Sequence, residues 1–147
     1  MTVRELHLWE IRGAITALFP HFLQEVGYHK KLNVNHLIPA WEGMARHGHA
    51  KTLVLGGTDS PAGIFLGLIV PDLFTGELQG LEVLWYVRRE HRKHSLRLLA
   101  TFEADAKKQG CTTILSGAVA DYKAEAMGRL YERRGYKFHG NAYEKNL

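Results

Sequence analysis

The sequence contains a single cysteine, Cys111, among its 147 residues. One cysteine cannot form a disulfide within the chain, and such sparing use of cysteine is typical of a reducing compartment. No apolar run approaches the ~20 residues that a membrane-spanning helix needs. The N-terminal segment includes Glu5 and Glu10, which a secretory or mitochondrial leader would not carry. We therefore expect a cytoplasmic protein that is not inserted in a membrane.

The sequence also lacks a set of residues suited to binding a metal. Of its nine histidines, the closest pairs are His47 with His49 and His91 with His94. No acidic residue lies within either pair, and no two histidines are spaced i, i+4 around a glutamate as in helical zinc sites. We predict surface histidines and no bound metal.

Acidic residues are fewer than basic ones, which gives a formal net charge of +4. Five of the nineteen Lys and Arg residues lie between Arg88 and Arg97. Nucleic-acid-binding surfaces usually spread their basic residues over a wider face, so nucleic acid is not the favoured partner. A short basic cluster that contacts nucleic acid or another protein stays open as an alternative.

Glycine is absent between Gly80 and Gly110, although this segment has the pattern of a strand, a turn and a helix. Apolar residues alternate over residues 81–87, and they recur every three or four positions after Ser95. The basic residues 88–94 connect the two. A helix N-terminus in this position presents N–H groups and the positive end of the helix dipole, which together favour phosphate binding. Because the glycines of a phosphate loop are missing, basic side chains would supply the attraction.

Three further helices are predicted. The first covers residues 8–26, and Pro20 is expected to kink or divide it. The second follows an N-cap at Asn35, and the last follows an N-cap at Asp121.

The predicted strands indicate a mixed sheet. Residues 51–55, 64–70 and 81–87 form β-rich runs joined by short turns, which is typical of an antiparallel meander. Residues 112–119 follow a helix and would therefore run parallel to the third strand. A hairpin near the C-terminus would close the chain. The prediction is an α/β protein, a single domain over residues 1–147, with about four helices flanking the sheet.

Three segments resemble the GCN5-related N-acetyltransferase family, and within it the small members found in phages and bacteria. They read LEVLWYVRREHR, LRLLATFEADAKKQG and RLYERRGYKFHGNAYEK. The resemblance extends over most of the chain and implies a twisted mixed sheet with helices on both faces. It also implies that two central parallel strands diverge and that the pantetheine arm of acetyl-CoA enters the gap between them.

The resemblance places an acetyl-CoA site at the end of the third strand. The family motif Q/R-x-x-G-x-G/A would begin at Arg92, with Ser95 and Arg97 at its small-residue positions. We expect Arg88, Arg89 or Arg97 to reach the 3′-phosphate. The residues predicted to bind the cofactor are Trp85, Tyr86, Val87, Arg92, Lys93, His94, Ser95, Leu96 and Arg97.

The resemblance also implies two catalytic residues. Glu82 would take a proton from the amine, directly or through a water, and Tyr131 of the segment L-Y-E-x-x-G-Y would protonate the leaving thiolate. A main-chain N–H near Tyr86 or Val87, freed by a strand bulge, would stabilise the oxyanion. The residue pattern alone favours a solvent-facing strand residue at Glu82, and it leaves open that Tyr131 is a tyrosine packed on a helix face. The position of Glu82 in the family is what favours the base.

The implied reaction is transfer of an acetyl group from acetyl-CoA to a primary amine of a small molecule or a protein, by direct attack in a ternary complex. A family member that binds coenzyme A without turnover stays open, because the glycines of the cofactor motif are missing. The acceptor is not readable from the sequence. A homodimer, common in the family, also stays open.

Overall fold

The structure is a computed structural model that describes residues 1–26, 32–117, 123–140 and 142–147. The chain divides into two compact units, Met1–Leu115 and Ser116–Leu147. Each unit is described by itself, so a single domain over the whole chain remains a prediction.

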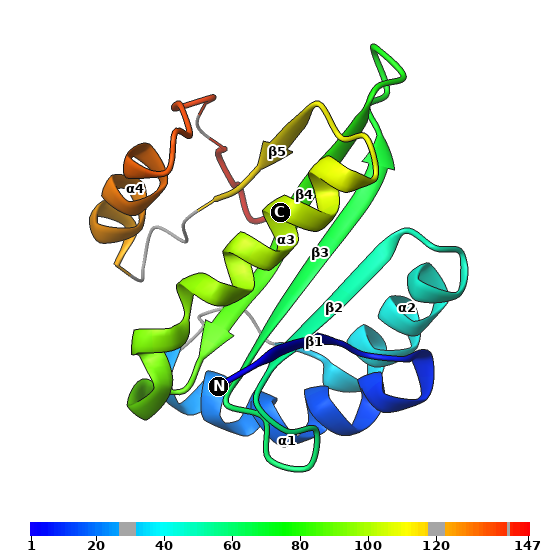
Figure 1. Ribbon diagram of the computed structural model, residues 1–147, viewed down its shortest axis with the longest axis vertical. Coiled ribbons are helices and arrows are strands. Elements are labelled where there is room, and N and C mark those ends of the chain that lie inside the picture. Colours follow the sequence, from blue (N-terminus) through cyan, green and yellow to red (C-terminus); the bar gives the residue numbers. More distant parts are fainter. Residues whose placement is uncertain (27–31, 118–122, 141) are drawn as a thin grey trace. The chain divides into compact units, whose positions relative to one another are not determined.

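The sheet of the first unit has five strands in the order of the sequence (Figure 1). They are β1 (Val3–Glu5), β2 (Ala50–Leu55), β3 (Gly63–Pro71), β4 (Leu78–Val87) and β5 (Thr113–Leu115). The first three pairings are antiparallel, and β5 runs parallel to β4. The predicted meander and parallel crossover are therefore confirmed. Of the strand predicted over residues 112–119, only β5 forms among the described residues, and residues 118 and 119 lie outside them.

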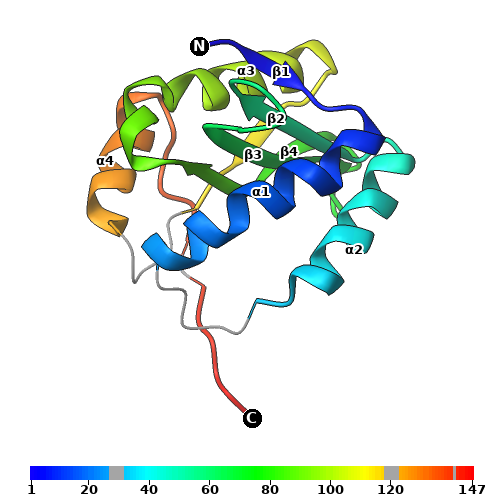
Figure 2. The same ribbon diagram turned by 90° about the horizontal axis from the view of Figure 1, so that it is seen from below.

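Two helices, α1 (Leu8–Val26) and α2 (Val34–Arg46), cover one face of this sheet (Figure 2). Apolar residues recur every three or four positions on both helices, so each has one apolar side. The buried residues that form the core on this face are Leu6, Ile11, Ala14, Ile15, Leu18, Phe19, Phe22, Ile38, Trp41, Val54, Ile64, Leu66 and Tyr86. Burial of such side chains stabilises the fold by roughly 1.5–3 kcal/mol each.

Two details of these helices differ from the prediction. α1 is not divided at Pro20, one of the two outcomes predicted for that residue, and the buried Phe19 and Phe22 on either side pack it against the sheet. α2 begins two positions earlier than predicted, because Asn33 rather than Asn35 is its N-cap. The side chain of Asn33 accepts a hydrogen bond of 3.2 Å from a main-chain N–H in the first turn.

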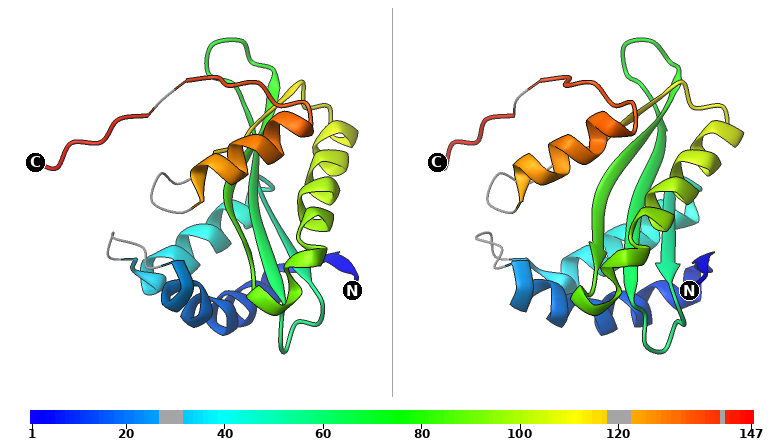
Figure 3. Two further views of the ribbon diagram at one scale, coloured as in Figure 1. Left: turned by 90° about the vertical axis from the view of Figure 1, so that its left-hand side faces the viewer. Right: turned by 60° about the vertical axis from the view of Figure 1, so that its left-hand side comes forward.

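The helix α3 (Leu96–Lys108) covers the opposite face of the sheet (Figure 3). Its fully buried Phe102 lies over two glycines of the strands below. A Cβ atom on Gly67 of β3 would lie 2.3 Å from the Phe102 ring, and one on Gly80 of β4 would lie 3.2 Å from it. These two positions are therefore glycine because the ring occupies the space of their side chains.

The second unit contains the helix α4 (Ala124–Arg133). Lys123, in the left-handed conformation with φ of 51°, is its N-cap, whereas the predicted cap Asp121 lies outside the described residues. Residues 134–140 and 142–147 form no strand. The predicted C-terminal hairpin is therefore absent from the described residues.

Candidate active site

The strand β4 is paired along its whole length on one side and along a short part on the other. Its register with β3 runs from Leu78 to Val87. Its register with β5 covers residues 79–81 alone. Among the described residues of the first unit, residues 82–87 therefore have one strand neighbour, and their main-chain groups on the other side form an edge of the sheet. The sequence resemblance predicts a gap between the two parallel strands at this place.

A bulge lies where the two halves of β4 meet. Leu66 of β3 pairs with Leu84, but the next residue, Gly67, pairs with Glu82, so Val83 is an extra residue in β4. A bulge of this kind leaves the extra residue unpaired and turns the strand. Glu82 is half-buried at its start and has interactions with other groups of the protein.

The bulge was predicted nearer the end of the strand, at Tyr86 or Val87, and that prediction was wrong. Both residues pair in regular register with β3. The bulge lies instead at Val83, next to Glu82. The candidate base and the candidate source of a free N–H group are therefore neighbours in the sequence of β4.

Trp85 carries an unsatisfied donor on the open half of β4. Its indole Nε1 is buried and has no hydrogen-bond partner among the described residues. The ring lies 6.4 Å from that of Phe65, which fixes it against the sheet. A buried N–H without an acceptor costs about 1–3 kcal/mol. This donor is therefore a suitable contact for an acceptor atom of a ligand.

The connection after β4 is helical. Residues Arg89–His94 form a 3₁₀ helix, η1, that leads into α3. The Ser95 N–H donates to the carbonyl of Arg92 at 3.0 Å, and the Ser95 side chain makes no capping bond. The predicted free N–H groups at a turn-to-helix junction are thus partly used, because the segment has no glycine or proline to interrupt the helix. Attraction for an anion depends here mainly on side chains.

The cationic side chains of this corner divide into paired and unpaired ones. Arg88 pairs with Glu90 at 2.8 Å, and Arg97 donates to the carbonyl of Met1 at 2.5 Å. Arg89 and Lys93 are exposed, and neither has a hydrogen bond or ion pair with another described residue. A phosphate can therefore bind Arg89 and Lys93 without breaking an existing ion pair or hydrogen bond. The fifth cation, Arg92, is paired with a carboxylate of α1.

Arg92 forms an ion pair with Glu25, the last residue but one of α1. The other carboxylate oxygen of Glu25 accepts a hydrogen bond of 2.8 Å from the hydroxyl of Tyr86. Glu25 therefore joins α1 to the end of β4 and to η1. The side chain of Glu25 is 23% exposed and that of Arg92 33%, so the pair is partly accessible to solvent.

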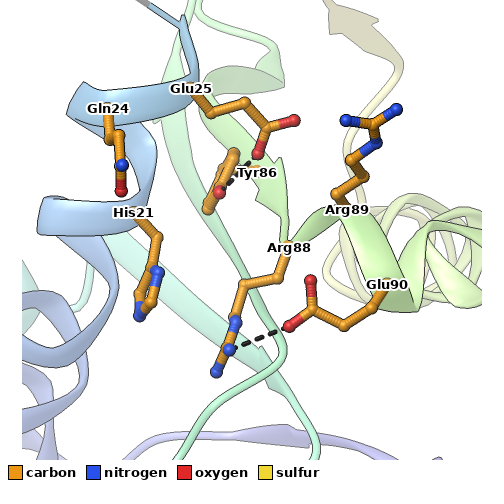
Figure 4. A pocket seen from close by; sticks show the side chains of 7 residues that line it. All are labelled: His21, Gln24, Glu25, Tyr86, Arg88, Arg89 and Glu90. Carbon is orange, nitrogen blue, oxygen red and sulfur yellow. Dashed lines mark hydrogen bonds and ion pairs between the residues drawn. The ribbon is translucent and has the colours of Figure 1, made fainter.

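Glu25 also lines a pocket between α1 and the end of β4 (Figure 4). The figure shows side chains of α1 on one wall and those of the β4–η1 corner on the other. The lining residues are His21, Gln24, Glu25, Tyr86, Arg88, Arg89 and Glu90.

Sequence reasoning missed Glu25, although a signal was present. The buried stripe of α1 continues from Leu18 to Phe22 and would next reach position 25, where an apolar residue is expected. A glutamate at that place indicates a carboxylate that faces other parts of the protein rather than bulk solvent.

Two shifted pKa values describe the charge of the corner. A hydrogen bond from its own main-chain N–H and the nearby Arg88 lower the pKa of Glu90. Desolvation, the N-terminal ammonium and Arg97 lower the pKa of His94, so this predicted cofactor residue is neutral at pH 7. The positive charge therefore comes from arginine and lysine. Burial raises the pKa of Cys111, which does not suit a nucleophile.

Tyr131, the predicted acid, lies in the second unit. It is buried on α4, and its hydroxyl donates to the carbonyl of Gly117 at 3.2 Å. Its ring lies 5.4 Å from that of Tyr136. Its position relative to Glu82 is not described, so the pairing of the two catalytic roles remains a prediction.

Within residues 1–26, 32–117, 123–140 and 142–147, no group of three or more His, Cys, Asp and Glu side chains is arranged to hold a metal ion. No helix in these ranges is long and apolar enough to span a bilayer.

No protein-family model and no curated protein matches this sequence. Solved structures match its fold. The ribosomal-protein-alanine N-acetyltransferase from Brucella melitensis biovar Abortus 2308 aligns over 100% of both chains, with a TM-score of 0.71 and 17% identity. A transcriptional regulator from Bacillus halodurans C-125 aligns over 99% of both chains, with a TM-score of 0.76 and 16% identity. An aminoglycoside acetyltransferase from an uncultured soil metagenomic sample, in complex with sisomicin, aligns over 99% of this chain and 95% of its own, with a TM-score of 0.73 and 9% identity.

At this level of identity the comparisons establish the architecture. The chain has the fold of the GCN5-related N-acetyltransferases, with a mixed sheet of five strands and four α-helices among the residues that the structure describes. The fold predicted from the sequence resemblance is therefore confirmed.

Proposed function

We propose that this protein is an N-acetyltransferase that transfers an acetyl group from acetyl-CoA to a primary amine. The observation that carries the proposal is the open half of β4. Residues 82–87 present an edge of the sheet next to the basic helix η1, in a chain that has an acetyltransferase fold. An extended ligand with amides can add to such an edge by main-chain hydrogen bonds.

The residues present fit an acetyl-CoA molecule. The amides of its pantetheine arm match the main-chain groups of residues 82–87, and the orphaned indole N–H of Trp85 suits a carbonyl acceptor. Its phosphates match the unpaired cations Arg89 and Lys93. The predicted contacts at Tyr86, Val87, Arg92, His94, Ser95, Leu96 and Arg97 complete the proposed site.

Acetyl-CoA supplies a thioester whose carbonyl carbon is open to attack by an amine. Glu82 takes a proton from the ammonium group, directly or through a water, so that the nitrogen becomes a nucleophile. The N–C bond forms and the C–S bond breaks. Tyr131 gives a proton to the departing sulfur and regains one from the attacking nitrogen, which loses its second proton as the amide forms. N–H groups at the Val83 bulge stabilise the charge on the oxygen. The products are an N-acetylated amine and coenzyme A.

Two other functions remain to be separated from this one. A protein that binds coenzyme A without turnover is favoured by Ser95 and Arg97 at the small-residue positions of the cofactor motif. A basic module for nucleic acid or protein is favoured by the charge of η1. We also propose that the protein acts in the cytoplasm. A monomer and a homodimer are both compatible with the proposed reaction.

The first experiment measures thermal unfolding with coenzyme A, acetyl-CoA and a DNA duplex. At about 100 times its Kd, a ligand stabilises a protein by about 2.7 kcal/mol, which is roughly 5–10 °C for a chain of this size. We expect this shift with coenzyme A and acetyl-CoA but not with DNA. A shift with DNA alone, lost at high salt, would favour the nucleic-acid module.

The second experiment follows the thiol released from acetyl-CoA in the presence of small amines, polyamines, aminoglycosides and peptides. Release that depends on one of these acceptors supports the transferase. Coenzyme A binding with no release across the whole set would instead support the non-catalytic protein.

A further inference from the structure

Glu25 and Arg92 form an ion pair with each other in the structure, which contains no ligand. Arg92 begins the cofactor motif and is expected to contact phosphate, yet its guanidinium is paired with the Glu25 carboxylate. The Tyr86 hydroxyl holds the second carboxylate oxygen at 2.8 Å. Tyr86 is 6% exposed and its ring meets that of Phe22 edge-on at 5.4 Å. Glu25 is therefore fixed in place, whereas Arg92 is the more exposed and movable partner.

A diphosphate at this corner would compete with Glu25 for Arg92. Arginine binds phosphate oxygens through two parallel hydrogen bonds, and the phosphates of coenzyme A carry more negative charge than one carboxylate. When Arg92 turns toward them, the partly buried carboxylate of Glu25 loses its counter-ion. An uncompensated carboxylate in such a position is unfavourable, so it attracts another cation.

We propose that Glu25 is a binding site for a cationic acceptor and that Arg92 blocks this site until coenzyme A is bound. The inference rests on the proposed function. It predicts an acceptor with at least two amino groups, such as a polyamine, because one ammonium pairs with Glu25 while another is deprotonated and acetylated. Binding of the donor therefore strengthens binding of the acceptor.

The pocket beside Glu25 carries both charges in its lining. Glu25 and Gln24 line it from α1, and Arg88, Arg89 and Glu90 line it from the opposite wall (Figure 4). Glu90 already pairs with Arg88 at 2.8 Å, and Arg89 is assigned above to the phosphates of coenzyme A. With coenzyme A bound, Glu25 is therefore the carboxylate of this pocket to which an ammonium group would donate.

The proposal predicts whether substitution of Glu25 strengthens or weakens the binding of coenzyme A. Coenzyme A binding is measured by calorimetry for the wild type, Glu25→Gln and Glu25→Asp, with Glu42→Gln as a matched control. Glu42 also belongs to an ion pair with α1, to Arg12 at 2.6 Å. If Glu25 competes for Arg92, Glu25→Gln binds coenzyme A about twofold to fivefold more tightly, as expected for removal of a partly exposed ion pair. Glu25→Asp, which retains the charge on a side chain shorter by one methylene group, shows a smaller gain of the same sign. If Glu25 merely holds Arg92 ready for the phosphates, both variants bind it more weakly, which would overturn the proposal.

A second measurement tests the acceptor class with spermidine as the probe. Spermidine is titrated into each protein with and without saturating coenzyme A. For the wild type we expect at least about tenfold tighter binding with coenzyme A present, a coupling within the ordinary range. Glu25→Gln should lose this gain, and Arg92→Gln should bind spermidine equally well in both states. Equal binding of spermidine to the wild type in both states, or no binding, would contradict the proposal.

These outcomes are separable from the proposed function. Turnover with another amine, combined with a Glu25→Gln variant that behaves as the wild type in both titrations, would reject the role of Glu25 and leave the transferase standing. A wild-type protein that binds no coenzyme A would reject both. Thermal unfolding of each variant shows whether a negative result comes from loss of the fold, and Glu25→Asp retains the charge if Glu25→Gln fails to fold.

Discussion

The sheet of the first unit has two edges that are treated differently. At one end, β1 is three residues long and carries Arg4 and Glu5, and Lys51 pairs with Glu5 at 3.0 Å. Short, charged edges are the usual protection against pairing with another chain. At the other end, the open half of β4 is longer and holds Val83, Leu84 and Trp85.

The difference indicates that the edge of β4 is built to be covered and the edge of β1 is not. Apolar residues at an edge exposed to water are unfavourable, and so is the buried indole N–H of Trp85 without an acceptor. A ligand with amide groups like those of the main chain would cover the apolar edge and would give the indole N–H an acceptor. The following predictions test this comparison, from the largest expected effect to the smallest.

The largest effect is expected at Glu82, on the open half of β4. Glu82→Gln removes the proposed base, and kcat should fall by about 10²–10⁴, while the Kd for coenzyme A changes little. Steady-state kinetics and calorimetry measure the two quantities. Glu125→Gln, an exposed glutamate of α4, is the matched control and should retain kcat. A Glu82→Gln enzyme with wild-type kcat would make Glu82 a structural residue.

On the paired side of β4, a smaller effect is expected from Gly67→Ala. The added methyl group would meet the buried Phe102 ring at 2.3 Å, and overpacking of this kind lowers the free energy of unfolding by about 1–3 kcal/mol. Chemical denaturation measures it. Gly43→Ala on α2 has nothing within 4 Å and should stabilise the protein by up to about 1 kcal/mol. Equal effects of the two substitutions would show that β3 and β4 are not packed under α3.

The unpaired cations beside the open edge should each have a modest effect on cofactor binding. Arg89→Gln and Lys93→Gln should each weaken coenzyme A binding by about twofold to fivefold, as expected for exposed charge pairs. Lys107→Gln, at the far end of α3, should have no effect. Repeating the titrations with dephospho-coenzyme A identifies the residue near the 3′-phosphate, because that variant then causes no further loss. If neither substitution changes the Kd, the phosphates bind elsewhere.

The smallest effect concerns the protected edge at β1. Arg4 pairs with Glu10 at 2.9 Å, and its hydrogen bond, with that of the His7 N–H, lowers the pKa of Glu10 from 4.5 to about 2. A carboxyl group with a lowered pKa stabilises the folded state above pH 4.5, and this contribution disappears as the pH falls toward 2. Glu10→Gln should therefore be slightly less stable than the wild type at pH 6 and equally stable near pH 2. A difference that does not depend on pH would contradict the ion pair.

Much of the fold followed from the sequence because its patterns are local. The alternation of Leu81, Val83 and Trp85 predicted a strand, and the spacing of Leu99 and Phe102 predicted α3. Errors arose where two residues offered the same chemistry. Asn33 and Asn35 are equally good caps, and the choice between them depends on how α2 packs on the sheet.

The site was less predictable because its features depend on contacts between distant segments. The bulge at Val83 is defined by the register with β3, which no single segment encodes. The Glu25–Arg92 pair joins residues on α1 and η1, and only the glutamate on the buried stripe of α1 signalled it. The 3₁₀ helix reflects the lack of glycine and proline after β4, whereas the missing glycines had been interpreted only in terms of phosphate binding.

Amide hydrogen exchange along β4, measured by NMR with and without coenzyme A, tests the central proposal most directly. We expect exchange to slow at the N–H groups of residues 82–87 that face away from β3, and to stay unchanged at residues 79–81, which β5 already pairs. Saturating coenzyme A that leaves exchange on the open half of β4 as it was would contradict the account.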